Sequence, residues 1–106
     1  MILFNITFAV DLQVREEFME FIRRTYIPAA LKCGMKSALM GRPRFEPQKN
    51  MITGTRSESF ALQMIAPTEG VLAGLTDSVL PLLYDKVTHW GPSVTLFPTV
   101  MDIVKP

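Results

Sequence analysis

Histidine, cysteine and tryptophan occur only once each in this chain of 106 residues. The single cysteine, Cys33, cannot form a disulfide within the chain, so the sequence is not that of a disulfide-stapled secreted domain. One histidine and one cysteine are also too few for a zinc site of the usual composition within one chain. We therefore expect no metal centre, and nothing else in the sequence indicates a cofactor.

The common motifs of phosphate binding and hydrolysis are missing as well. The chain contains no glycine-rich phosphate loop, no GxSxG turn, no CxxC pair and no HExxH helix. Its 11 basic and 10 acidic side chains nearly cancel, so no strong field draws it to nucleic acid or to an anionic membrane. Residues 42–56 are rich in proline and charge and are typical of a solvated loop. The cations there are Arg42, Arg44, Lys49 and Arg56. We expect no nucleic-acid partner.

The opening segment, MILFNITFAV, is apolar but has no charged residues at its start. It is interrupted by Asn5 and Thr7, and Asp11 follows it directly. A segment of this kind does not fit a signal peptide and is far too short to span a bilayer. We expect a cytoplasmic protein with no membrane partner.

What the chain does have is an excess of apolar residues. They make up 48% of the sequence, and the mean hydropathy is +0.22. A single domain of this size buries about two-thirds of the surface that its unfolded chain exposes, so a monomer should be more polar. The excess favours apolar surface buried against a second copy, and we predict a homodimer.

The first third of the chain predicts a strand and then a helix. Aromatic and β-branched residues alternate over 2–10, which is typical of a strand with one buried face. Apolar residues then recur every three or four positions over 14–26, which indicates an amphipathic helix. Pro28 is expected to interrupt this helix, and a short helical turn continues to Gly34.

Three more strands are expected, at 35–41, 55–65 and 93–104. Pro98 lies inside the last of these strands, which favours an edge position or a bulge because proline cannot donate to a neighbouring strand.

Helical sequence lies between the third and the fourth strand and is expected in two pieces. Gly70 and Gly74 weaken the first piece. Asp77 or Ser78 is expected to cap the second piece, in whose first turn Pro81 is tolerated.

The order β-α-β-β-α-β predicts one α+β domain over residues 1–106 with a ferredoxin-like plait, that is, a four-stranded antiparallel sheet with two helices on one face. Such a sheet leaves its other face bare. A second subunit laid sheet to sheet would cover that face and form a dimeric α/β barrel.

Five residues are candidates for binding a small ligand. Asn5, Thr7 and Gln63 are polar residues on the face of the strands that is expected to be bare. If that face is buried between subunits, they either hydrogen-bond one another or line a ligand pocket, whose rim Tyr26 and His89 could reach. For His89 the favoured interpretation is structural, because a cation suits the last turn of a helix that Gly91 and Pro92 end.

Three segments of the chain resemble a known family when they are taken together. They are MILFNITFAVD running into EEFMEFIRRTYIPAAL, then SFALQM, and finally FPTVMDIV. Together they are similar to family 4286 of domains of unknown function, which consists of small bacterial proteins. The resemblance implies a ferredoxin-like fold that associates in pairs as a dimeric α/β barrel. It implies no reaction and no catalytic residue.

These observations favour a homodimeric module that binds a small ligand or another protein surface. The alternative is a cofactor-independent enzyme of the dimeric α/β-barrel type, a monooxygenase or an isomerase, that works between the sheet and the helices. The enzyme would need a titratable side chain in an enclosed pocket, and Tyr26 and His89 are the candidates.

Overall fold

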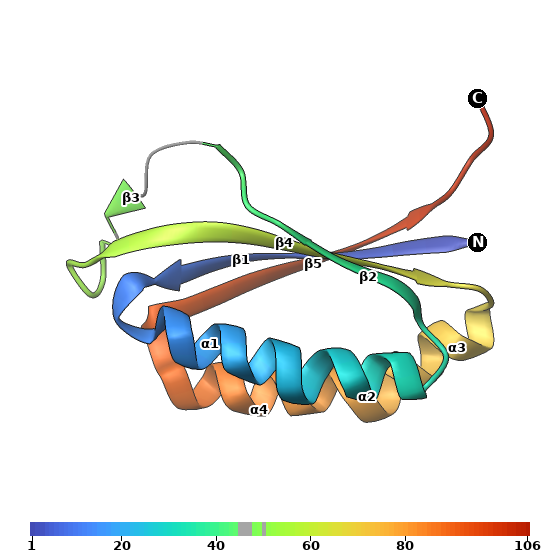
Figure 1. Cartoon of the computed structure of the whole chain (residues 1–106), viewed down its shortest axis with the longest axis horizontal. Coiled ribbons are helices and arrows are strands. Elements are labelled where there is room, and N and C mark those ends of the chain that lie inside the picture. Colours follow the sequence, from blue (N-terminus) through green and yellow to red (C-terminus); the bar gives the residue numbers. More distant parts are fainter. Residues whose placement is uncertain (45–47, 50) are drawn as a thin grey trace.

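The computed structural model describes residues 1–44, 48–49 and 51–106, and only the backbone of 48–49. One antiparallel sheet is covered on a single face by one layer of helices (Figure 1). The strands lie in the order β2-β4-β1-β5, and the short β3 pairs with β4. Their bounds are β1 (Ile2–Asp11), β2 (Lys36–Gly41), β3 (Gln48–Lys49), β4 (Arg56–Ala66) and β5 (Val94–Asp102).

The helices occupy the two intervals that the sequence predicts. They are α1 (Arg15–Phe21), α2 (Ile27–Lys32), α3 (Glu69–Gly74) and α4 (Leu80–Trp90). The predicted ferredoxin-like plait is therefore confirmed, and β3 adds two residues to the predicted four-stranded sheet. Within the described residues, no helix is both long enough and apolar enough to cross a membrane.

β1 is the centre of the sheet, with β4 on one side and β5 on the other. Its alternating sequence sends Phe4, Ile6 and Phe8 toward the helices, where all three are buried. In register with Phe8 are Phe60 on β4 and Leu96 on β5. The inward half of the pattern thus forms the core beneath the helices.

One aromatic side chain on α1 joins the two layers. The ring centroid of Phe18 lies 4.9 Å from that of Phe8 and 5.9 Å from that of Phe60, both on the sheet. It also lies 5.9 Å from the ring of Trp90, at the end of α4. Because Phe18 is fully buried, these contacts fix the first helix against the sheet and against the second helix.

Both helical segments are continuous, which corrects two predictions, that Pro28 would interrupt the first segment and that the second would form two pieces. Residues 15–32 and 69–90 are helical throughout, and each contains a five-residue π-turn, Ile22–Tyr26 and Leu75–Val79. An interior proline crowds the carbonyl four residues before it. For Pro28 and for Pro81 that carbonyl lies inside the π-turn. We attribute the tolerance of proline to the wider spacing of that turn.

The start of the second helix also differs from the prediction. Thr68 is its N-cap, with a side-chain oxygen that accepts a hydrogen bond from the backbone N–H of Val71 at 3.2 Å. Asp77 and Ser78 lie within the π-turn and cap nothing, because the helix has already begun.

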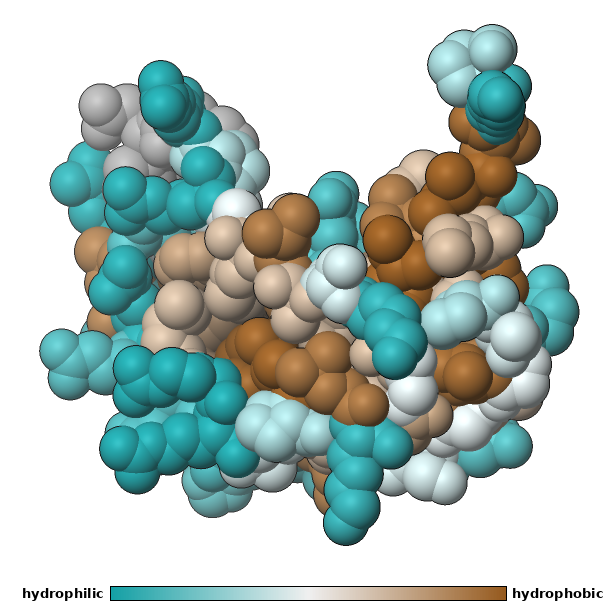
Figure 2. All heavy atoms as spheres, turned by 45° about the vertical axis from the view of Figure 1, so that its right-hand side comes forward, coloured by the Kyte–Doolittle hydropathy of each residue, from teal (hydrophilic) through white to brown (hydrophobic). Residues whose placement is uncertain are grey.

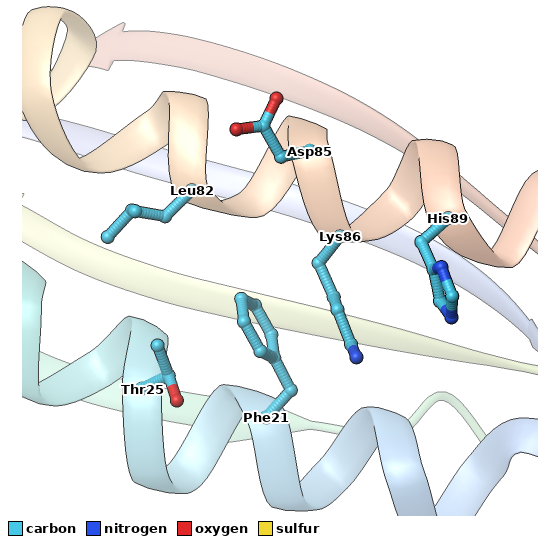
Figure 3. Close-up of a pocket in the computed structure, with 6 residues that line it drawn as sticks. All are labelled: Phe21, Thr25, Leu82, Asp85, Lys86 and His89. Carbon is cyan, nitrogen blue, oxygen red and sulfur yellow. The ribbon is translucent and has the colours of Figure 1, made fainter.

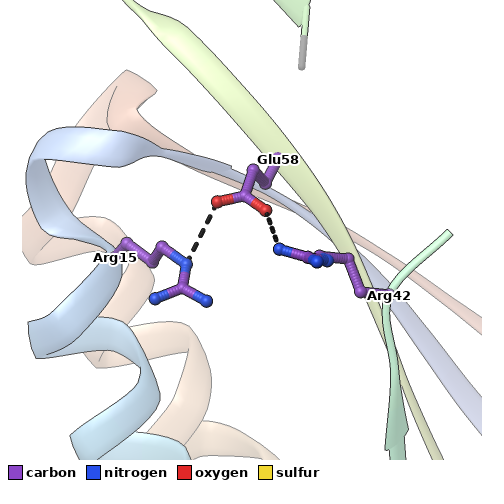
Figure 4. Close-up of polar contacts among 3 residues, drawn as sticks. All are labelled: Arg15, Arg42 and Glu58. Carbon is purple, nitrogen blue, oxygen red and sulfur yellow. Dashed lines mark hydrogen bonds and ion pairs between the residues drawn. The ribbon is translucent and has the colours of Figure 1, made fainter. Parts of the chain in front are cut away.

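Glu58 on β4 connects three parts of the chain (Figure 4). Its Oε1 lies 3.1 Å from Nε of Arg15 at the start of α1, and its Oε2 accepts a hydrogen bond of 2.9 Å from Arg42, just after β2. The Arg15 guanidinium also lies 5.8 Å from the centroid of the Phe60 ring. Arg42, one of the cations expected on a solvated loop, is thus paired, whereas the side chain of Lys49 lies outside the described residues.

Candidate functional site

The five residues that the sequence nominates for ligand binding lie in three separate places. Asn5, Thr7 and Gln63 are on the sheet face that the helices leave uncovered, which we call the outer face. Tyr26 is buried beneath the opposite face, and His89 is exposed on the outside of the helix layer. The structure therefore keeps Asn5, Thr7 and Gln63, which we call the sheet trio, on one face. The tyrosine and the histidine lie on the other side of the sheet.

The sheet trio forms a polar strip across the middle of the outer face. Asn5 is paired in register with Gln63 on β4 and with Thr99 on β5. The Asn5 side-chain amide donates a hydrogen bond of 3.2 Å to the hydroxyl of Thr7. The amide of Gln63 is exposed and makes no side-chain hydrogen bond within the described part of the chain. Gln63 is thus available for a group from outside this chain.

Apolar side chains frame the polar strip. Phe97 on β5 is 71% exposed, and Leu39 on β2 is 68% exposed. Phe97 is in register with Thr7, and Leu39 with Gln63, so both belong to the outer face. Figure 2 shows brown, hydrophobic side chains gathered in the hollow between the two ends of the molecule that project beyond the sheet. A large aromatic side chain exposed on a sheet face is typical of a surface that another surface covers.

Tyr26 is the last residue of the first π-turn, and its side chain is wholly buried. Its hydroxyl has no hydrogen-bond partner within the described residues. Burial raises the pKa of this hydroxyl well above its usual range, and Cys33 and Tyr84 add smaller contributions in the same direction. Tyr26 is therefore a neutral hydrogen-bonding group in the core, at a net cost to stability.

His89 lies on a shallow, open groove between the first helix and α4 (Figure 3). Leu82, Lys86 and His89 project from α4 toward the facing helix, from which Phe21 points back, whereas Asp85 points away. His89 makes no hydrogen bond or ion pair with any residue that the structure describes. It lies in the last turn of α4, before Gly91 at φ 63°, which confirms the prediction that a helix ends here.

The polar groups beside this groove bind one another. The indole N–H of Trp90 donates a hydrogen bond of 2.7 Å to Glu17, and Arg24 lies 3.2 Å from the Glu20 carboxylate. The Lys86 ammonium lies 5.2 Å from the Trp90 ring centroid and 6.0 Å from that of Phe21. The contacts of Trp90 with Glu17 and of Lys86 with Phe21 join the two helices, and we interpret the groove as part of the helix packing.

The contacts of Trp90 with Phe21 and Glu17 were not predicted, because they join residues on different helices, whereas Lys86 lies four residues before Trp90 on α4 itself. The spacing of Phe18, Phe21 and Trp90 on two apolar helix faces was the available signal. No group of three or more histidine, cysteine, aspartate or glutamate side chains is placed to hold a metal ion among the described residues.

Architecture and outer face together define a small ferredoxin-like α+β protein with one bare sheet face. The chain belongs to the family described as "Domain of unknown function (DUF4286)", whose model matches residues 1–104. The resemblance noted from the sequence is thereby confirmed. A search of the curated proteins finds no match to this chain.

Solved structures with the same fold cover nearly the whole chain. A Deinococcus radiodurans protein with the provisional name antibiotic biosynthesis monooxygenase has a TM-score of 0.73 at 14% identity, over 100% of this chain and 95% of its own. An ethyl tert-butyl ether d (EthD) family protein of Bacillus halodurans has a TM-score of 0.58 at 14% identity, over 97% and 100%. A dimeric ferredoxin-like protein of an uncultured marine organism has a TM-score of 0.57 at 13% identity, over 99% and 97%. Such low identities show a shared fold alone.

Replacing Tyr26 by phenylalanine should preserve or raise stability at neutral pH. The change removes a buried hydroxyl that has no partner, and the gain should be up to about 1 kcal/mol. Above pH ~10 the unfolded chain loses the tyrosine proton while the folded chain keeps it, so wild-type stability falls by up to about 1.4 kcal/mol per pH unit. Tyr26→Phe lacks this loss, and its advantage should widen in urea titrations at rising pH.

Tyr84→Phe provides the control, since it removes a hydroxyl from an exposed position. A loss of more than about 1 kcal/mol in Tyr26→Phe at neutral pH would show that the buried hydroxyl has a hydrogen-bond partner in solution.

Proposed function

We propose that this chain acts as a homodimeric interaction module in which two copies pack their outer sheet faces together. The observation that carries the proposal is the exposure of Phe97 and Leu39 on a sheet face that no helix covers. A second copy covers both residues at once, since a two-fold axis brings the same face of each copy together.

The surface area of the chain agrees with this proposal. The chain exposes 6682 Å². A compact monomer of 11.9 kDa should expose about 5,950 Å², which leaves an excess of roughly 730 Å². A standard protein–protein interface buries about 800 Å² on each partner. The excess, to which the projecting loop at 51–55 and the C-terminal residues 103–106 contribute (Figure 1), is of the same order as that area.

The edges of the sheet favour stacking of faces over pairing of edge strands. β5 is one edge strand, and Pro98 in its middle lacks the N–H that a new neighbouring strand would need. β2 is the other edge of the main sheet, where the register shifts between Lys36 and Leu39 and Ser37 has a φ of 55°. Such an irregular strand is a poor template for pairing.

The polar strip would lie inside the proposed interface. Buried amides and hydroxyls need hydrogen bonds, and Gln63 has none within the described part of the chain. In the dimer, Asn5, Thr7 and Gln63 of one copy hydrogen-bond their counterparts or a small polar ligand held between the sheets. The dimeric ferredoxin-like protein of the marine organism supports the assembly by its fold and its name.

A second candidate function is a cofactor-independent enzyme that works between the sheet and the helices. Tyr26 favours it, because a buried, unpartnered hydroxyl that lowers stability is a feature that functional sites often keep. The fold shared with the provisionally named monooxygenase is compatible with this alternative. Native mass spectrometry tests it. An added mass that is lost from the wild type on denaturation, and is absent from Tyr26→Phe, would support the enzyme, whereas no added mass favours the interaction module.

Replacing Phe97 by aspartate should convert the dimer to a monomer. Two carboxylates would be buried without partners inside the interface, which should raise the dimer dissociation constant by about 1,000-fold or more. Sedimentation equilibrium of the two proteins measures the change. Leu82→Asp, which places the same charge on the helix layer, is the matched control and should leave the dimer intact. A wild-type protein that sediments as a monomer would overturn the proposed function.

A further inference from the structure

The chain that follows β5 leaves the sheet as an arm, residues 103–106. Figure 1 shows the arm turning away from the helices, toward the side of the outer face. Its one hydrogen bond among the described residues joins the backbone N–H of Ile103 to the carbonyl of Met1, at 3.0 Å. Ile103 is 47% exposed and Val104 is 78% exposed. The arm thus leaves a large part of two apolar side chains in contact with solvent.

The arm continues an apolar stripe of the outer face. Met101 is in register with Leu3, and Phe97 with Thr7, so both side chains lie on that face. The hydrogen bond between Ile103 and Met1 extends the same ladder by one residue beyond the end of β5. Because strand side chains alternate, Ile103 falls on the same side as Met101. Phe97, Met101 and Ile103, with Thr99 between the first two, thus run along the edge of the sheet and onto the arm.

We infer that the arm packs Ile103 and Val104 against the second copy of this chain, at the end of the stacked sheets. The inference rests on the proposed sheet-to-sheet dimer and adds a contact outside the two faces. It commits to a second copy for two reasons. The stripe on the arm is continuous with the proposed interface, and the arm rises on the side where that copy lies (Figure 1). Figure 2 shows the same arm standing out from the body, with hydrophobic side chains at its base.

The double substitution of Ile103→Ser and Val104→Ser tests the arm. It keeps the backbone and therefore the hydrogen bond to Met1, and removes only the apolar side chains. The dimer dissociation constant, measured by sedimentation equilibrium, should rise by roughly 10- to 100-fold. Leu31→Ser is the matched control. Leu31 is 45% exposed on the helix layer, and its replacement should leave the constant unchanged.

The outcomes separate this inference from the proposal on which it rests. A dissociation constant that stays at the wild-type value in the double variant, while Phe97→Asp is monomeric, overturns the arm contact and leaves the sheet-to-sheet dimer standing. A Phe97→Asp variant that remains dimeric overturns the sheet-to-sheet dimer. Equal weakening by Leu31→Ser and by the double variant would also contradict a contact specific to the arm.

Discussion

The central strand β1 is the constraint on which the rest of the structure depends. It is paired along nearly its whole length with β4 and with β5, so each of its side chains must belong to one of two faces. Phe4, Ile6 and Phe8 form the core under the helices, and Asn5 and Thr7 then fall on the outer face. The hydrophobic core and the polar strip both follow from the alternating sequence of this one strand.

Much of the fold could be predicted because its signals are local. Period-two alternation located the strands, and Pro98 indicated the edge position that β5 has. The continuous helices were not predicted. A π-turn before each proline depends on how the whole helix packs and has no simple sequence pattern. Pro28 therefore indicated a break where the first helix has a π-turn.

The candidate site could be predicted only in part, for a related reason. Asn5, Thr7 and Gln63 were placed together correctly, because strand pairing and alternation fix which residues share a face. Tyr26 and His89 were expected near the same rim, but helix orientation places them on the other side of the sheet, at different depths. The contact of Trp90 with Glu17 spans 73 positions in the chain, and no local pattern encodes it. The outer face that results has a polar centre and an apolar frame.

The distance between the two helix layers of the dimer tests the sheet-to-sheet account most directly. A nitroxide at Asp85→Cys, in a Cys33→Ser background, labels one site on the outside of α4 in each copy. Stacked sheets lie about 10 Å apart, and each helix layer lies about 10 Å behind its sheet, so the labels should be about 30 Å apart or more. Pulsed electron–electron resonance measures this distance. A separation under about 20 Å would mean that the helix layers face each other, and the absence of any intermolecular distance would mean a monomer; either result contradicts the account.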